Sequence, residues 1–324
     1  MKKFLKTISY VIFANTLLLP SITPHAHAFA TRPVRIIVPL TAGGSMDSVA
    51  RALSARLGDN LKQSVVIDNR PGAGALIALD ILSSAAADGH TLMVIGGTSI
   101  VYPILYKSRY DMRRDVSHVS QLTAQGYVLV IHPSLPAKTP SEFVNYIKVN
   151  PNKVNYSSSG IASPTHMAGE LLQLATGGRM THIPYKGMGA AYTDLISGQV
   201  QASFPAAISS MAHVTAGRLR AIGVTTPKRM SVLPNTPTFV EAGYDSMIVL
   251  NWYSLIAPLK MPAALAEQIA AETRKAVLSP EMGKSLAAEG SEAVGSTPAE
   301  LASHVRLEHD KWARVVKAAG ITAQ

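Results

Sequence analysis

The residues of this chain best suited to chemistry lie in glycine- and serine-rich turns between strand-like and helix-like runs. The first turn is Thr41-Ala42-Gly43-Gly44-Ser45, between the apolar run Val34–Val38 and a helical pattern that opens at Met46. Paired glycines let the backbone approach a ligand closely, and Ser45 is suited to cap the helix. First-turn N–H groups and the helix dipole would then favour a bound carboxylate. We therefore expect ligand contacts from Ala42, Gly43, Gly44 and Ser45.

The same turn lacks the marks of a nucleotide-binding loop. A Walker loop ends in lysine followed by serine or threonine, and a dinucleotide fingerprint has a third glycine at a fixed spacing; neither is present. Asp47 lies in the first helical turn, where it stabilises the dipole but would repel a second anion. We expect Asp47 to order water or to accept a hydrogen bond from a ligand hydroxyl or amine. A tight turn with nothing bound is the alternative for this segment alone.

A second strand-to-helix turn, Tyr156–Ser163, contains the run Ser157-Ser158-Ser159-Gly160. Its hydroxyls and N–H groups would form a neutral polar cradle, so Ser158, Ser159, Gly160 and Ser163 are predicted to bind ligand. His166 follows in the next helix, where it either caps and packs or contacts the ligand. A serine hydrolase is the alternative, but the glycines that flank the serine of a nucleophile elbow are missing, and no acid is placed to orient His166.

Three further turns complete the expected binding surface. Ile183-Pro184-Tyr185-Lys186-Gly187 offers Tyr185 and Gly187 as lining residues, while the ammonium group of Lys186 is expected at the surface. Gly96-Gly97-Thr98-Ser99 offers the hydroxyl of Thr98. The turn Phe204-Pro205-Ala206-Ala207 is apolar and contributes Pro205.

No catalytic residue, metal site or cofactor is predicted. The chain has no cysteine, and its histidines are dispersed without the spacing of a helical zinc motif. Trp252 and Trp312 are interpreted as core or hinge packing. Several ligand-cradling turns without a nucleophile, base or metal indicate a binding protein.

The order of apolar runs predicts an α/β protein of two domains. Strand-like runs alternate with helical patterns in a βαβαβ rhythm, which favours a parallel sheet covered on both faces. We place the first domain at residues 31–126 plus 250–324 and the second at 127–249. The two chain crossings between them would form a hinge, with the ligand in the crevice at the carboxyl ends of the strands.

The first 30 residues predict a secretory signal peptide. Lys2, Lys3 and Lys6 precede the mostly apolar run Ile8–Leu19, and small-x-small sites allow cleavage near residues 28–30. The formal net charge is +10, but the basic residues are scattered, so a nucleic-acid partner is not expected. The excess of positive charge indicates a mild preference for anionic small molecules.

The order of these motifs resembles the Bug-type receptors, the extracytoplasmic solute-binding proteins of tripartite tricarboxylate transporters. The first matching segment is Arg35-Ile36-Ile37-Val38-Pro39 through Ala42-Gly43-Gly44-Ser45-x-Asp47. Further matches cover most of the chain in a fixed order: Asn69-Arg70-Pro71-Gly72-Ala73-Gly74, Asp88-Gly89-His90, His132-Pro133-Ser134-Leu135-Pro136, Tyr156-Ser157-Ser158-Ser159-Gly160, Pro184-Tyr185-Lys186-Gly187 and Ala216-Gly217-Arg218-Leu219-Arg220.

The resemblance implies a type II periplasmic-binding-protein fold, with two βα domains that close on a small carboxylate. It implies ligand contacts from the loop Leu40–Asp47, from the serine turn and from ordered water. It also implies a periplasmic receptor whose partners are integral membrane permease subunits. We expect a monomer. A carboxylate-sensing receptor for a signalling partner is the alternative within the binding class.

Three positions depart from the pattern that the resemblance sets. Pro205 stands where aspartate is common, Tyr102 stands in place of an asparagine, and Leu40 occupies a position that is commonly aromatic. A pocket with fewer charged and polar groups favours an aromatic or otherwise bulkier carboxylate.

Overall fold

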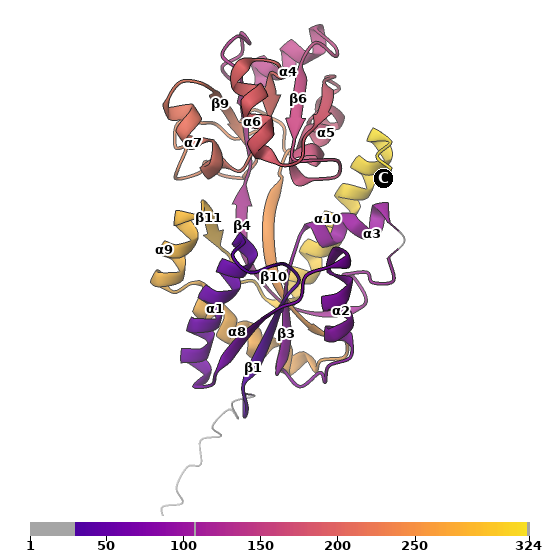
Figure 1. Cartoon of the computed structure of the whole chain (residues 1–324), viewed down its shortest axis with the longest axis vertical. Coiled ribbons are helices and arrows are strands. Elements are labelled where there is room, and N and C mark those ends of the chain that lie inside the picture. The colour runs from indigo at the N-terminus through magenta and orange to yellow at the C-terminus, as the bar shows by residue number, and fades with distance from the viewer. Residues whose placement is uncertain (1–29, 107, 323–324) are drawn as a thin grey trace, which may run out of the picture.

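The computed structural model describes residues 30–106 and 108–322 and shows two lobes, one above the other in Figure 1. The expected signal peptide lies outside the described residues, apart from Ala30. Among the described residues, no helix is both long and apolar enough to cross a membrane. We call the lower lobe in the figure lobe 1 and the upper lobe, which holds the serine turn, lobe 2.

Lobe 1 is built on a six-stranded sheet with the order β11-β4-β10-β3-β1-β2. The strands are β1 (Val34–Val38), β2 (Val65–Asn69), β3 (Thr91–Gly96), β4 (Val116–Gly126), β10 (Leu250–Pro258) and β11 (Ser291–Ala293). β1 pairs in parallel with both β2 and β3, as the βαβ rhythm predicts. The other half of the sheet is antiparallel. The sheet is therefore mixed, because β10 re-enters lobe 1 from lobe 2 and runs against its neighbours.

Lobe 2 is built on a smaller sheet of five strands with the order β7-β6-β8-β5-β9. The strands are β5 (Val128–Ile131), β6 (Asn155–Ser158), β7 (Thr181–Pro184), β8 (Ala202–Ser203) and β9 (Arg220–Val224). β6 pairs in parallel with β7 and β8, whereas β5 pairs antiparallel with β8 and β9. The parallel strands β6 and β7 end at the serine turn and the Tyr185 turn respectively, so both turns lie at one edge of this sheet.

Helices cover the two sheets. Lobe 1 has α1 (Ser45–Leu61), the 3₁₀ turn η1 (Ala73–Ala75), α2 (Leu76–Ser83), α3 (Thr98–Leu105), α8 (Ala263–Val277), α9 (Pro280–Ala288) and α10 (Pro298–Ala319). Lobe 2 has α4 (Pro140–Val149), α5 (Pro164–Thr176), α6 (Met188–Ser197) and α7 (Ala207–Thr215). Helix α4 starts with a side-chain cap: the side chain of Thr139 accepts a hydrogen bond from the Glu142 N–H, and Pro140 occupies the first helical turn.

The chain crosses between the lobes where β4 passes into β5 and where the chain re-enters β10 (Figure 1). Thr225 ties the two crossings together. Its hydroxyl group donates to the Val249 carbonyl at 2.6 Å and accepts from the Tyr127 N–H at 2.9 Å, and its own N–H donates to the Tyr127 carbonyl. The two strand crossings are thus joined by one buried threonine.

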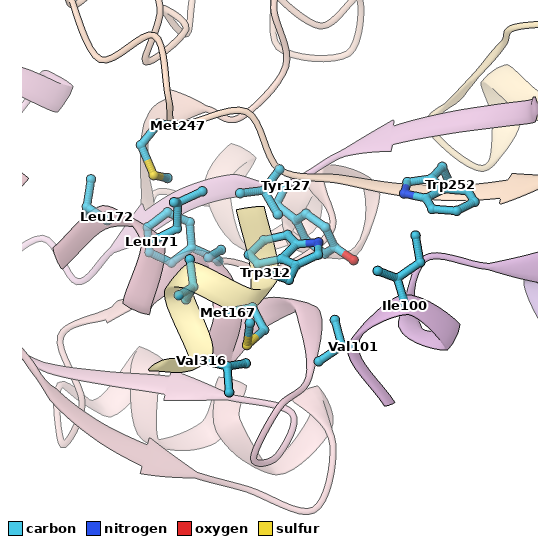
Figure 2. Close-up of a cluster of buried hydrophobic side chains, with 14 of the residues drawn as sticks. Ile100, Val101, Tyr127, Met167, Leu171, Leu172, Met247, Trp252, Trp312 and Val316 are labelled. Atoms are coloured by element: carbon cyan, nitrogen blue, oxygen red, sulfur yellow. The ribbon is translucent and has the colours of Figure 1, made fainter. Parts of the chain in front are cut away.

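Helix α10 forms a third link between the lobes. It packs against α3 and β4 of lobe 1 and against α5 of lobe 2. Trp312 is 5% exposed and belongs to the same buried cluster as Met167 of α5 and Val101 of α3, as Figure 2 shows. Its indole N–H donates to the Glu308 carboxylate at 2.9 Å, and Lys311 bridges Glu308 and the Ile248 carbonyl. The expected packing role of Trp312 is therefore confirmed.

Candidate ligand-binding cleft

The turn between β1 and α1 is held in place by the buried carboxylate of Asp47, which is 3% exposed. One carboxylate oxygen accepts the Gly43 N–H and the Arg51 Nε–H, each at 2.9 Å, and the other accepts the Asn69 side-chain amide at 3.0 Å. Asn69 also donates to the Leu40 carbonyl at 3.1 Å. Three segments of lobe 1 are thereby fixed around the turn.

These contacts define what Asp47 does in this structure. The hydrogen bond from Arg51, helped by those from Gly43 and Asn69, outweighs burial and lowers the pKa of Asp47 to about 2. Both carboxylate oxygens are engaged by protein donors, so Asp47 shapes the turn. Its contact with water or with a ligand donor stays a prediction.

The start of α1 differs by one residue from the expectation. Gly44 is the N-cap, without a side-chain cap, and Ser45 is the first helical residue. The hydroxyl group of Ser45 instead lies 2.6 Å from that of Tyr253 on β10. Gly43 has a φ of 93°, which favours glycine, and a Cβ atom added at Gly43 or Gly44 would meet nothing within 4 Å. Leu40, Ala42, Gly43, Gly44 and Ser45 are all exposed, so the turn is open to a ligand.

In lobe 2, the serine turn is organised by Thr165. The threonine hydroxyl accepts the Ser159 N–H at 2.9 Å and lies 3.2 Å and 2.9 Å from the hydroxyls of Ser159 and Ser163. Ser163 caps α5 by accepting the His166 N–H. Gly160 has a φ of 134°. Ser159, Gly160 and Ser163 are partly exposed.

A buried group of aromatic and acidic side chains lies beneath this turn. The rings of His166 and His182 stack with centroids 3.8 Å apart. His166 Nδ1 accepts the Ala162 N–H at 3.0 Å, which places its ring proton on Nε2, 3.6 Å from the Glu170 carboxylate. Tyr156 donates to the same carboxylate at 2.6 Å. His166 is 5% exposed and supports the turn from below; a direct contact with ligand stays a prediction.

His182 supports Ser158. The Nε2 atom of His182 lies 2.6 Å from the Ser158 hydroxyl oxygen, which also accepts the Gly160 N–H and donates to the Gly160 carbonyl. Burial, together with the proximity of His166, lowers the pKa of His182 to about 4. Burial opposes the ionisation of Glu170, yet hydrogen bonds from His166 and Tyr156 prevail and keep its pKa below the usual value.

The remaining predicted residues take different positions. Tyr185 donates its hydroxyl to Asp194 at 2.6 Å, and burial together with this bond raises the pKa of Tyr185 to about 12. Gly187 begins α6 with a φ of 97° and open space around it. Lys186 is exposed, as expected, whereas Pro205 is buried and its carbonyl accepts the Val128 N–H.

Thr98 connects the lobes at the cleft. It is exposed at the start of α3 and lines a hinge cavity together with Ala162 and Pro164 of lobe 2 and with Trp252. Trp252 is 1% exposed, consistent with its expected packing role, but its indole N–H has no hydrogen-bond partner. Thr98 also lines a groove of about 400 Å³ in lobe 1. The residues that follow β3 in lobe 1 and those that begin α5 in lobe 2 therefore line one cavity.

The site has no arrangement typical of nucleophilic catalysis or of a bound metal. The hydroxyls of Ser45 and Ser159 contact Tyr253 and Thr165 rather than a histidine. Ser158 does contact His182, but its side chain is fully buried. Over residues 30–106 and 108–322, no three histidine, aspartate or glutamate side chains are grouped to hold a metal ion.

Over residues 49–321, the sequence matches the protein family described as "Tripartite tricarboxylate transporter family receptor". The chain belongs to this receptor family. A curated relative of this receptor, the protein BugT of Bordetella pertussis, is 31% identical over 91% of each chain. The predicted family is thereby confirmed.

Solved structures agree with the fold of this receptor. An R. palustris protein determined with adipate is 31% identical, with a TM-score of 0.70 over 90% of this chain and 99% of its own. MatC from Rhodopseudomonas palustris, determined with bound malate, is 28% identical, with a TM-score of 0.67 over 89% and 99% of the chains. The periplasmic binding protein BugD is 28% identical, with a TM-score of 0.67 over 91% of this chain and 99% of its own. The two-lobed periplasmic-binding-protein fold is thereby confirmed.

Proposed function

We propose that this receptor captures a small organic carboxylate between its two lobes. The observation that carries the proposal is the pair of exposed turns, one at the end of β1 and one at the end of β6. Each turn ends where a helix of more than three turns begins, so each lies at the positive end of a helix dipole. Hydroxyl groups from Thr98, Ser159 and Ser163 add neutral donors. Relatives solved with adipate and malate support a carboxylate ligand.

The proposed ligand contacts come from both lobes. Leu40, Ala42, Gly43, Gly44, Ser45 and Thr98 would line the lobe 1 side. Ser159, Gly160, Ser163, Tyr185 and Gly187 would line the lobe 2 side. The buried residues Asp47, Ser158, His166 and Pro205 would act through the backbone that they hold. Bending at the Thr225 hinge would close the lobes over the ligand.

We further propose that the closed form delivers its ligand to integral membrane permease subunits, without turnover. Residues 1–30 would direct export to the periplasm and be removed, and N-terminal sequencing of the exported protein tests the cleavage near residues 28–30. The two lobes would be residues 31–126 plus 250–324 and residues 127–249. The receptor would act as a monomer, which light scattering on the purified protein tests.

A thermal-shift screen of mono-, di- and tricarboxylates tests the proposed function. A ligand that binds the folded state at one hundred times its Kd raises the free energy of unfolding by about 2.7 kcal/mol. We expect at least one acid to raise the Tm without being consumed. The absence of a shift with every acid at millimolar concentration would contradict the proposal, as would conversion of the acid to a product.

A further inference from the structure

Lobe 1 extends the cleft into a groove with a largely apolar lining. Its apolar walls are Pro39, Leu40, Met46, Pro71, Ala75 and Tyr102. Thr98 belongs both to this groove and to the hinge cavity that Ala162 of lobe 2 also lines. The groove therefore borders, at Thr98, the cavity where the two lobes meet.

Tyr102 forms an aromatic wall of the groove. Its ring stacks on Tyr106 with centroids 4.7 Å apart. The ring also lies against Gly74, where an added Cβ would come within 2.9 Å of it. Gly74, with a φ of 61°, thus makes room for the ring beside the start of α2. The Tyr102 ring therefore lines this end of the groove.

Charge is missing from the same surface. None of the described residues that line the groove is charged. Arg51 and Arg70, in neighbouring segments, are paired with Asp47 and Asp68 respectively. A second carboxylate placed in the groove would lose water without gaining a charged side chain among these residues as a partner, which is unfavourable. The lining therefore favours the apolar part of a ligand.

Each of the two ligand turns also exposes a large apolar side chain. Leu40 beside the first turn is 49% exposed, and Ile161 in the serine turn is 39% exposed. Covering such side chains with an apolar ligand removes their surface from water at about 25 cal/mol per Å². Both lobes thus present apolar surface next to their hydrogen-bond donors.

We infer that the ligand is a monocarboxylate with an aromatic or aliphatic body. The carboxylate binds at the two turns, and the body lies in the groove against Tyr102 and Leu40. This inference rests on the proposed function and narrows its substrate class. Tyr102 and Leu40 are then specificity-determining residues, because they contact the part of the ligand that distinguishes one acid from another.

Titration calorimetry with two matched pairs of acids tests the inference. Benzoate is compared with terephthalate, and hexanoate with adipate, since each pair differs only in the second carboxylate. We expect the monocarboxylate to bind at least about tenfold more tightly in at least one pair. Tighter binding of terephthalate and adipate than of their partners would overturn the inference and leave carboxylate capture standing. If none of the four acids binds, and neither malate nor citrate does, the proposed function fails as well.

Variants of the groove supply a second readout. Tyr102→Asn is expected to weaken binding of the preferred monocarboxylate by about tenfold, whereas Tyr102→Phe keeps the ring and the affinity. Leu40→Asn changes a half-exposed side chain, so it leaves the core intact and is expected to weaken binding about threefold to tenfold. Tyr146→Asn on α4 of lobe 2 is the matched control outside the groove. Wild-type affinity in both Tyr102→Asn and Leu40→Asn, with folding verified by circular dichroism, would overturn the inference.

Discussion

Acidification should destabilise lobe 2 through His182, which is held next to the serine turn in its neutral form. The pKa of His182 falls from 6.5 to about 4 on folding because of burial and the adjacent His166 ring, partly opposed by Glu170. Between these two pH values the unfolded chain binds a proton at His182 that the folded chain does not. The resulting stabilisation is therefore fully present above pH 6.5 and is lost as the pH falls towards 4.

The expected loss of stability follows from the size of the pKa shift of His182. At about 1.4 kcal/mol per tenfold change in proton affinity, a fully enclosed ring would contribute about 3 kcal/mol. His182 is only partly buried, so solvent screening reduces the expected loss to about 1–2 kcal/mol. Glu170 has a lowered pKa and adds to the loss only as the pH falls below its usual value near 4.5. The other groups that face the ring are Tyr156, His166 and the Ser158 hydroxyl.

Urea unfolding at pH 7.5, 6.5, 5.5 and 4.5 measures this effect. We compare the wild type with His182→Gln, in which the titrating ring is removed, and with His132→Gln, whose imidazole contacts Ser134 in a separate loop. His182→Gln is expected to lose about 1–2 kcal/mol less than the wild type between pH 7.5 and 4.5, whatever its stability at pH 7.5. His132→Gln should keep the wild-type slope. Equal slopes for the wild type and His182→Gln would refute the reasoning.

Four further substitutions test particular contacts. Asp47→Asn should cost about 2 kcal/mol in urea unfolding, because the Gly43 N–H and Arg51 lose a charged acceptor, and an unchanged midpoint would contradict the role of Asp47 in the turn. Gly74→Ala should destabilise more than Gly177→Ala, since both have a positive φ but only the former meets a ring, at 2.9 Å; equal losses would contradict this. Trp312→Ala should cost about 3–5 kcal/mol in the same assay, and a loss below about 1 kcal/mol would show that α10 does not bind the lobes together. Thr139→Ala should lower the stability by about 1 kcal/mol through loss of the α4 cap, and a loss no larger than that of the neighbouring change Ser141→Ala would contradict it.

Local features of the fold were predictable because their causes are local. Thr139 and Ser163 cap helices with residues three positions away, and Pro140 and Pro164 follow them directly. The strand ends that carry the turns are marked by apolar runs followed by glycine or serine. Strand β4 does not have an apolar run in its sequence, because several of its buried residues are polar. Ser120, for example, donates to the Ser296 carbonyl at 2.7 Å from a distant segment.

The supporting residues of the site were harder to predict because they come from other elements. Asn69 reaches Asp47 from the end of β2, and His182 reaches Ser158 from β7. Tyr253 contacts Ser45 across more than two hundred residues. Sequence spacing does not show such pairs, since they depend on which strands are neighbours in the sheet. A polar residue at the carboxyl end of a neighbouring parallel strand is the signal that could have indicated Asn69, whereas His182 lies inside β7.

Amide chemical shifts test the central claim, capture of a carboxylate between the two turns, most directly. The ¹⁵N-labelled protein is titrated with the acid that gives the largest thermal shift, and the amide signals of both lobes are followed. We predict saturable shifts at Gly43 and Gly44 in lobe 1 and at Ser159 and Gly160 in lobe 2, with one common Kd. Shifts confined to one lobe, or centred on residues outside the two turns, would contradict the account.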